Sequence, residues 1–328
     1  MAHFQLAMQH VRLSDHHSQC PLCADASTQE GWLMGIPGLN LQRITAIAVA
    51  GGKLLESRLS YCPGCDFGYF HPTPSRQFLE DFYRAGGGVD DGVPDASRLR
   101  TLDGANFQAE SIQVLSMMQL AGIDLASKRG GCALEIGPGY ACYARIFQTL
   151  GMQYWANEPG NGSAAFLARN FGARILDTDL EQISSESDSS FDLIFSKDSF
   201  EHHPDPLASL ARCCRLLRPG GHLVVTVPNL HSRSLKAHSV THPYFAFPPH
   251  LNYFSRRSFE RVLTHEGLQD IAIQTFAFPS EIHYCMELGI KLGVCRPEGE
   301  YLDELSASDG HERLFIVARR PPRGAQGL

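Results

Sequence analysis

The stretch ALEIGPGYACYARIF, residues 133–147, joins an apolar run to the expected start of a helix through a glycine-rich turn. Between a strand and a helix, such a turn lets the backbone approach a ligand closely, and the unpaired N–H groups of the first helical turn point at that ligand. A dinucleotide site requires a third glycine, or an alanine, three residues after Gly139, and Cys142 occupies that place. The dinucleotide pattern is therefore incomplete.

Outward from this turn, short apolar runs alternate with amphipathic segments, which is typical of a parallel sheet covered by helices. Ile112, Leu115 and Met118 mark one face of a preceding helix, and Pro219-Gly220-Gly221 is expected to end another. Strands are expected at 132–136, 154–158, 173–177, 191–195, 222–228, 271–278 and 313–320. The pattern predicts an α/β fold with a Rossmann-like, doubly wound sheet of seven strands that ends in an edge hairpin.

A second reading of the turn pairs an acid with small residues at fixed spacing: Glu135, Gly137, Gly139 and Ala141. Here the chain resembles the class I S-adenosylmethionine-dependent methyltransferases, over about residues 105–320. The resemblance implies that Glu135 holds the methionine end of the cofactor, directly or through water, above the glycine turn. The ammonium and sulfonium of this cofactor need a carboxylate and no phosphate cradle. Alternatively, Glu135 only pairs or caps inside a generic sheet.

Further matches follow in the order of that family. Glu158, at the end of the second expected strand, takes the place of the acid that accepts hydrogen bonds from both ribose hydroxyls, although a dinucleotide enzyme also carries an acid there. Asp179 and Leu180 match the residues that meet the adenine, and Asp177 is the alternative to Asp179. Tyr83 takes the place of an aromatic residue that covers the cofactor carboxylate in some relatives, or it belongs to a helix core.

Methyl transfer to a hydroxyl or an acidic carbon needs a base, and histidine titrates in the right range. The resemblance places Glu201 and His202 in SFEHHPDP, past the fourth expected strand, where some relatives carry base or metal-binding residues. His250 in PPHLNYFS is a second candidate, and Tyr253 and His242 are weaker ones. Alternatively, His202 packs beside the cofactor or caps the following helix, and His250 fixes its loop through backbone hydrogen bonds.

Two Cys-x-x-Cys pairs lie in the N-terminal part of the chain, Cys20 with Cys23 and Cys62 with Cys65. Four thiolates suit one tetrahedral zinc ion, and a β-rich insert can fill the long gap between the pairs. The module resembles the zinc-binding region of sugar C-methyltransferases. A redox role for CPGC would require a preceding strand and a helix directly after it, and DFGYFHP does not offer that helix.

The composition limits the classes of partner. The 328 residues contain 28 Lys and Arg against 35 Asp and Glu, so the net charge of −7 leaves no broad basic face for nucleic acid or an anionic membrane. Neither a signal-like N-terminus nor an apolar run of about 18 residues is present in the sequence. We therefore expect a cytoplasmic protein whose partner is a small molecule; the sequence does not predict its oligomeric state.

These patterns predict a zinc-binding module over 1–75, a helix with a Gly-rich linker or lid over 76–104, the methyltransferase domain over 105–320 with a substrate-facing insertion at 229–254, and a tail over 321–328. The predicted activity is methyl transfer from S-adenosylmethionine to oxygen or carbon of a small polar acceptor, such as a sugar or a biosynthetic intermediate. The alternatives are a nonenzymatic interaction module that uses its zinc knuckles, and an NAD-dependent enzyme.

Overall fold

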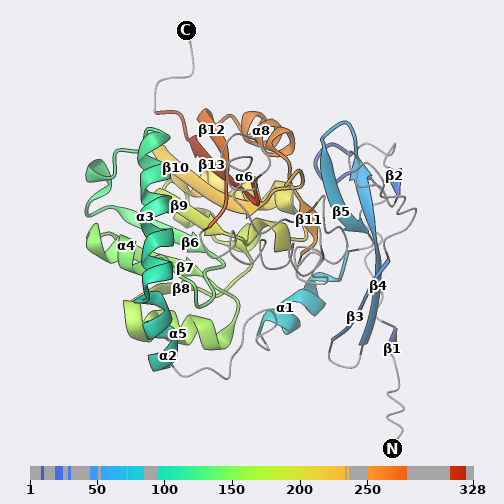
Figure 1. Cartoon of the computed structure of the whole chain (residues 1–328), viewed down its shortest axis with the longest axis horizontal. Helices are drawn as coiled ribbons and strands as arrows, with labels where there is room; N and C mark the ends of the chain where they lie inside the picture. Colours follow the sequence, from blue (N-terminus) through green and yellow to red (C-terminus); the bar gives the residue numbers. More distant parts are fainter. Residues whose placement is uncertain are drawn as a thin grey trace, which may run out of the picture.

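A computed structural model contains two β-sheets side by side, with helix α1 (Arg76–Arg84) between them (Figure 1). It describes residues 9–10, 19–24, 29–30, 45–50, 53–71, 73–84, 95–232, 235, 250–278 and 311–322. The candidate His242 therefore lies outside the described residues. Among the helices that can be described, none has the length and the apolar composition of a membrane span.

The larger sheet has seven strands in the order β12-β13-β10-β9-β6-β7-β8. Its strands are β6 (Cys132–Ile136), β7 (Gln153–Asn157), β8 (Arg174–Leu176), β9 (Phe191–Lys197), β10 (Leu217–Pro228), β12 (Gln269–Phe276) and β13 (Arg313–Arg319). Strand β13 is antiparallel to both of its neighbours, and the other adjacent pairs are parallel. The predicted doubly wound sheet with an edge hairpin is confirmed.

Helices cover this sheet on both faces (Figure 1). They are α2 (Asp95–Leu102), α3 (Ala105–Leu120), α4 (Ala144–Thr149), α5 (Asn161–Phe171), α6 (Pro206–Leu216) and α8 (Arg256–His265). The central strands are apolar because both of their faces are buried; Leu134, Leu193 and Val224 are fully inaccessible to solvent. Strands that are buried on both faces consist of apolar residues without alternation. This pattern is recognisable in the sequence, so these strands could be predicted.

Three local expectations were wrong. The side chain of Ile112 is 64% exposed, whereas Met118 of the same expected face is buried, together with Glu110, Val114 and Met117. Helix α6 ends at Leu216, and Pro219-Gly220-Gly221 belongs to β10, where Gly220 adopts a φ of +83° at a register shift. Helix α2 begins at Asp95, inside a stretch expected to be a loop.

The smaller sheet combines the N-terminal segment with a strand from far along the chain. It contains β1 (Gln9–His10), β2 (Gln29–Glu30), β3 (Thr45–Ala50), β4 (Lys53–Cys62), β5 (Phe67–His71) and β11 (Asn252–Tyr253). Strand β11 lies in the predicted insertion and pairs antiparallel with β5. The N-terminal module is thus joined to the insertion by backbone hydrogen bonds, although the sequence treated the two as separate units.

Candidate active site

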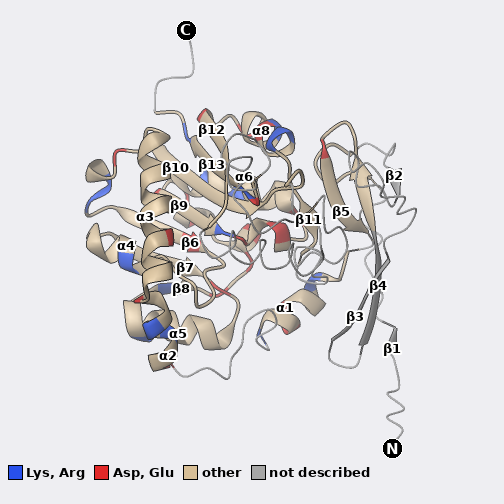
Figure 2. Cartoon of the chain, viewed as in Figure 1, with Lys and Arg blue, Asp and Glu red and all other residues tan. Residues whose placement is uncertain are grey.

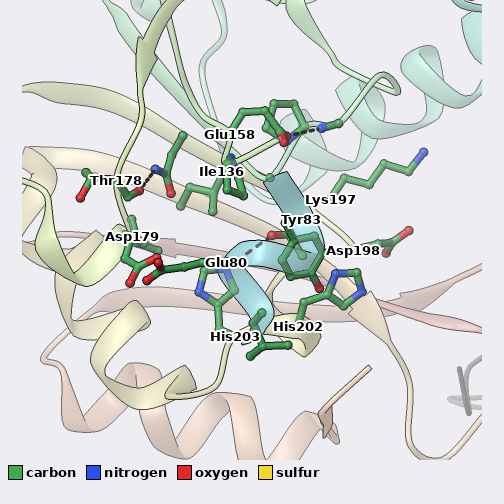
Figure 3. A pocket seen from close by; sticks show the side chains of 18 of the residues that line it. Glu80, Tyr83, Ile136, Glu158, Thr178, Asp179, Lys197, Asp198, His202 and His203 are labelled. Atoms are coloured by element: carbon green, nitrogen blue, oxygen red, sulfur yellow. Dashed lines mark hydrogen bonds between the residues drawn. The ribbon is translucent and has the colours of Figure 1, made fainter. Parts of the chain in front are cut away.

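A cavity of about 570 Å³ opens at the carboxyl ends of β6, β7 and β9, the edge where doubly wound sheets bind ligands. Helix α1, which lies between the two sheets (Figure 1), lines the cavity through Leu79 and Tyr83, and Figure 3 shows Tyr83 there. In the view of Figure 2, acidic and basic segments are interspersed over the fold. The cavity wall carries both signs as well.

The glycine turn between β6 and α4 lines one end of the cavity. Gly137 and Gly139 have φ values of +58° and +53°, a region that residues with a side chain rarely adopt. At Gly137, a Cβ atom would lie 2.2 Å from the Ser199 Oγ. Both glycines are therefore required by the backbone path, and the turn exposes main chain to the cavity as the sequence suggested.

Glu135 lies beneath this turn and not in the cavity wall. Its side chain is fully buried; one carboxylate oxygen accepts a hydrogen bond from the Tyr143 N–H at 3.0 Å and the other accepts one from the Tyr154 hydroxyl at 2.7 Å. Burial raises the pKa of Glu135 to about 7, against the opposing effect of these two donors. In this structure Glu135 braces the start of α4 from below, and direct contact with a cofactor stays a prediction.

Glu158 follows β7 and lines the cavity (Figure 3). One of its oxygens accepts a hydrogen bond from the Gly139 N–H and the other from the Gly160 N–H, both at 2.8 Å. The carboxylate therefore ties the glycine turn to the start of α5.

Asp179 and Leu180 line the cavity after β8. The side-chain amide of Asn157 holds this segment by donating hydrogen bonds to the carbonyls of Leu176 and Thr178, at 2.9 and 2.7 Å. Asp177, the alternative candidate, is 60% exposed, pairs with Arg84 at 3.4 Å and does not line the cavity.

Tyr83 and His202 form another part of the cavity wall. Their rings stack with centroids 6.2 Å apart and 12° between the planes (Figure 3). The Tyr83 hydroxyl and the His202 Nε2 are both buried and have no hydrogen-bond partner among the described residues. Burial lowers the pKa of His202 well below its usual value, and His250 and His203 act in the same direction. His202 is therefore neutral.

Glu201, His250 and Tyr253 lie behind this wall and do not line the cavity. Glu201 is 1% exposed, and burial together with the negative charge of Asp198 raises its pKa well above the usual range. The rings of His202 and His250 stack at 4.9 Å. Tyr253 is buried against Phe70, with ring centroids 5.9 Å apart. The structure thus brings Glu201, His202 and His250 together and places Tyr253 in the packing beside them.

Several residues of the cavity wall were missed by the sequence analysis. Arg76 pairs with both Asp179 and Glu181 across the cavity. Lys197 pairs with Glu110. The segment SKDSFEHH, directly after a buried strand, was the signal that could have pointed to Lys197, because strand ends line such sites.

The four N-terminal cysteines converge in the smaller sheet. Their sulfur atoms lie within 4.8 Å of one another, and the Sγ atoms of Cys23 and Cys62 are 3.7 Å apart. Cys20, Cys62 and Cys65 are buried, and none of the four is in a disulfide. CPGC forms the turn between β4 and β5, so a strand follows it, and the helix required for a redox motif is not there.

Comparison with known proteins identifies the domain. Residues 114–273 match the family model described as a methyltransferase domain. Over 120 residues, the chain is 32% identical to the dimethylglycine N-methyltransferase of Parasynechococcus marenigrum, which covers 32% of this chain and 41% of that protein. Over 50 residues it is 40% identical to the ubiquinone biosynthesis O-methyltransferase of Xanthomonas oryzae pv. oryzae, covering 15% of this chain and 21% of that protein. The matches span less than half the length of these relatives.

Among solved structures, the phosphoethanolamine N-methyltransferase 2 of Haemonchus contortus in complex with S-adenosyl-L-methionine is 20% identical, with a TM-score of 0.49 over 74% of this chain and 60% of that one. The Burkholderia thailandensis 1,6-didemethyltoxoflavin-N1-methyltransferase is 14% identical, with a TM-score of 0.46 over 81% and 96%. The family match and the strand order identify a class I methyltransferase domain, the domain of S-adenosylmethionine-dependent methyltransferases.

Proposed function

We propose that this protein transfers the methyl group of S-adenosylmethionine to an oxygen or carbon atom of a small polar acceptor, such as a sugar or a biosynthetic intermediate. The observation that carries the proposal is one cavity with two chemically different groups of lining residues. The glycine turn, Glu158 and Asp179 form the first group, called here the cofactor end, and Tyr83 and His202 form the second, called here the acceptor end. A cofactor and an acceptor would meet between them.

The cofactor end suits a cationic nucleoside. Glu158 offers a bidentate carboxylate to ribose hydroxyls, and Asp179 with Leu180 offers an acceptor and an apolar surface to adenine. Main chain at Gly137 and Gly139 leaves room for the methionine part above the turn. Acidic side chains in the wall also stabilise the positive charge of the sulfonium and the ammonium.

The acceptor end suits a group that loses a proton. Methyl transfer is an in-line displacement, in which the acceptor lone pair forms the new bond while the carbon–sulfur bond breaks and its electron pair stays on sulfur. Alignment and exclusion of water supply much of the rate enhancement. His202, which is neutral and lines the cavity, would take the acceptor proton, and the stacked Tyr83 ring holds its orientation.

The four N-terminal cysteines are proposed to hold a structural zinc ion. In a tetrahedron with zinc–sulfur bonds of about 2.3 Å, neighbouring sulfur atoms are about 3.8 Å apart. The Cys23–Cys62 separation of 3.7 Å agrees with that value. By fixing the turn between β4 and β5, the ion would hold β5 against β11, and so anchor the segment that carries His250.

The test is formation of S-adenosylhomocysteine, which is released whichever acceptor is methylated. Full-length protein would be incubated with S-adenosylmethionine labelled in its methyl group and with panels of sugars, phenols and hydroxy acids. We expect label transfer to a hydroxylated or carbon-acid acceptor, and none with the Glu158→Ala variant. If no member of any panel is methylated, or if amines alone accept the label, the proposed acceptor class is wrong.

A further inference from the structure

The wall behind His202 contains buried polar atoms whose partners are missing. Both carboxylate oxygens of Glu201 and the Nε2 of His202 have no hydrogen-bond partner within the part of the chain that the structure describes. Buried polar atoms are almost always paired, and leaving a carboxylate unpaired is expensive. Three such atoms in one place indicate a partner that the described residues do not supply.

The spacing of these groups fits an ion between them. A carboxylate oxygen of Glu201 and one ring nitrogen each from His202 and His250 lie within 4.8 Å of one another. The His202 Nε2 and the Glu201 Oε1 are 3.9 Å apart, too far for a hydrogen bond. Two ligand atoms at about 2.1 Å from one metal ion are at most about 4.2 Å apart. The cluster therefore needs only a small contraction to close on a cation.

The two segments that carry these groups are held together by their backbones. Glu201 and His202 lie in the 3₁₀ turn after β9, and His250 lies two residues before β11. The Leu251 N–H donates a hydrogen bond to the Glu201 carbonyl at 2.8 Å, and the Asn252 side-chain amide donates one to the His203 carbonyl at 2.7 Å. The fold thus fixes the cluster independently of the side chains that form it.

We infer that Glu201, His202 and His250 bind a divalent transition-metal cation of the zinc, iron(II) or manganese class. Two imidazoles and one carboxylate suit these ions, whereas magnesium and calcium prefer oxygen ligands throughout. Asp198 is not available as a further ligand, because Arg313 engages both of its oxygens at 2.7 to 3.0 Å. Three protein ligands leave coordination positions open for a small molecule.

This inference rests on the proposed methyl transfer and narrows its acceptor to a hydroxyl. Since His202 lines the cavity, an ion beside it can take the acceptor oxygen into an open position and make the O–H proton easier to lose. The proton leaves to solvent, the oxygen forms a bond to the methyl carbon, and the carbon–sulfur bond breaks. The products are a methyl ether and S-adenosylhomocysteine. His202 then acts as a metal ligand and not as the base.

The absorption spectrum of bound cobalt(II) distinguishes this site from the cysteine site. Cobalt bound by thiolates absorbs strongly through sulfur-to-metal charge transfer, whereas cobalt bound by nitrogen and oxygen shows only weak d–d bands. Full-length protein would be produced in a medium containing cobalt, and its metal content and absorption measured. We expect two equivalents in the wild type, one for each kind of site.

Variants show which residues bind the second equivalent of cobalt. Glu201→Gln and His250→Ala should each weaken cobalt binding at the nitrogen and oxygen site at least tenfold, remove the weak bands and keep the thiolate absorption. His265→Ala is the matched control, because that side chain is 73% exposed and outside the cluster. Retained binding of S-adenosylmethionine shows that the variants are folded. Two variants are used so that the test still holds if one of them does not fold.

Two results would overturn the inference: a single equivalent with thiolate absorption alone in the wild type, or a second equivalent that survives in both variants. The proposed function fails separately. A protein with two cobalt equivalents that does not bind S-adenosylmethionine would retain the metal site and lose the methyl transfer. A protein that methylates hydroxyls with one equivalent would lose only the metal site.

Discussion

The two ends of the cavity differ in how their polar groups are satisfied. At the cofactor end, both oxygens of Glu158 accept backbone N–H groups, and both oxygens of the underlying Glu135 accept hydrogen bonds. At the acceptor end and directly behind it, the Tyr83 hydroxyl, the His202 Nε2 and the Glu201 carboxylate have no partners among the described residues. At the cofactor end the polar atoms are hydrogen-bonded within the protein before any ligand binds. At the acceptor end they are not, and a ligand could supply the missing hydrogen bonds.

This difference predicts how substitutions at the two ends affect the stability of the fold. A satisfied buried network rigidifies its surroundings, and unsatisfied buried groups cost stability that only a ligand returns. We therefore expect substitutions at the cofactor end to affect folding and cofactor affinity together. Substitutions at the acceptor end should affect catalysis while leaving stability unchanged or improved.

The largest effect is expected at the glycine turn. In Gly137→Ala, the new methyl group would overlap the Ser199 side chain in a backbone conformation with positive φ, so the free energy of unfolding should fall by roughly 3 kcal/mol. Gly151→Ala is the matched control: φ is +64° and nothing lies within 4 Å of the added atom, so a loss of about 1 kcal/mol is expected. Urea unfolding measures both, and equal losses would show that the turn is not crowded.

The stabilities of two tyrosine variants compare the two ends of the cavity directly. Tyr154→Phe removes the hydroxyl that donates to Glu135, and should cost roughly 2 kcal/mol at pH 8. Tyr83→Phe removes a buried hydroxyl without a partner among the described residues, so the stability should stay within about 0.5 kcal/mol of the wild type or rise. Unfolding curves give the difference. A loss in Tyr83→Phe as large as in Tyr154→Phe would remove the distinction between the ends.

A further expected effect is a dependence of stability on pH that arises from Glu135. Its folded pKa of about 7 lies above the usual value of 4.5, so between these values the folded state binds more protons than the unfolded state. Stability should therefore fall as the pH rises from about 4.5 to 7 and then level off. Glu135→Gln, which cannot ionise, should flatten this part of the curve. Denaturant midpoints of variant and wild type across that range measure the change, and parallel curves would contradict it.

Much of the fold could be predicted from the sequence, since strands buried on both faces form apolar runs that need no distant information. All seven strands of the larger sheet were located from their apolar runs, including β8 and β12, which are only partly buried. The pairing of β11 with β5 was not, because nothing local in residues 250–254 indicates a partner almost two hundred residues earlier. The exposed Ile112 shows the same limit on a helix, which buries Glu110 in an ion pair with Lys197 and leaves that apolar side chain in solvent.

Some residues of the candidate site could likewise be predicted from the sequence, and others could not. Glu158, Asp179 and the glycine turn follow strand ends, and their place at the cavity is a consequence of the sheet. Glu135 also follows the motif, yet the structure puts it below the turn, since the strand residue two before Gly137 points into the core. Arg76 could not be predicted, because its contacts with Asp179 and Glu181 cross from helix α1 to a segment about a hundred residues away.

The most direct test of the central claim, that Glu158 and the glycine turn form a ready site for S-adenosylmethionine, is a calorimetric titration of wild type and Glu158→Ala with that cofactor. The wild type should bind one equivalent, and the variant should bind about 100-fold more weakly, because it loses the ribose acceptor and the brace between Gly139 and Gly160. Affinities within about threefold of each other, or no binding by the wild type, would contradict the claim.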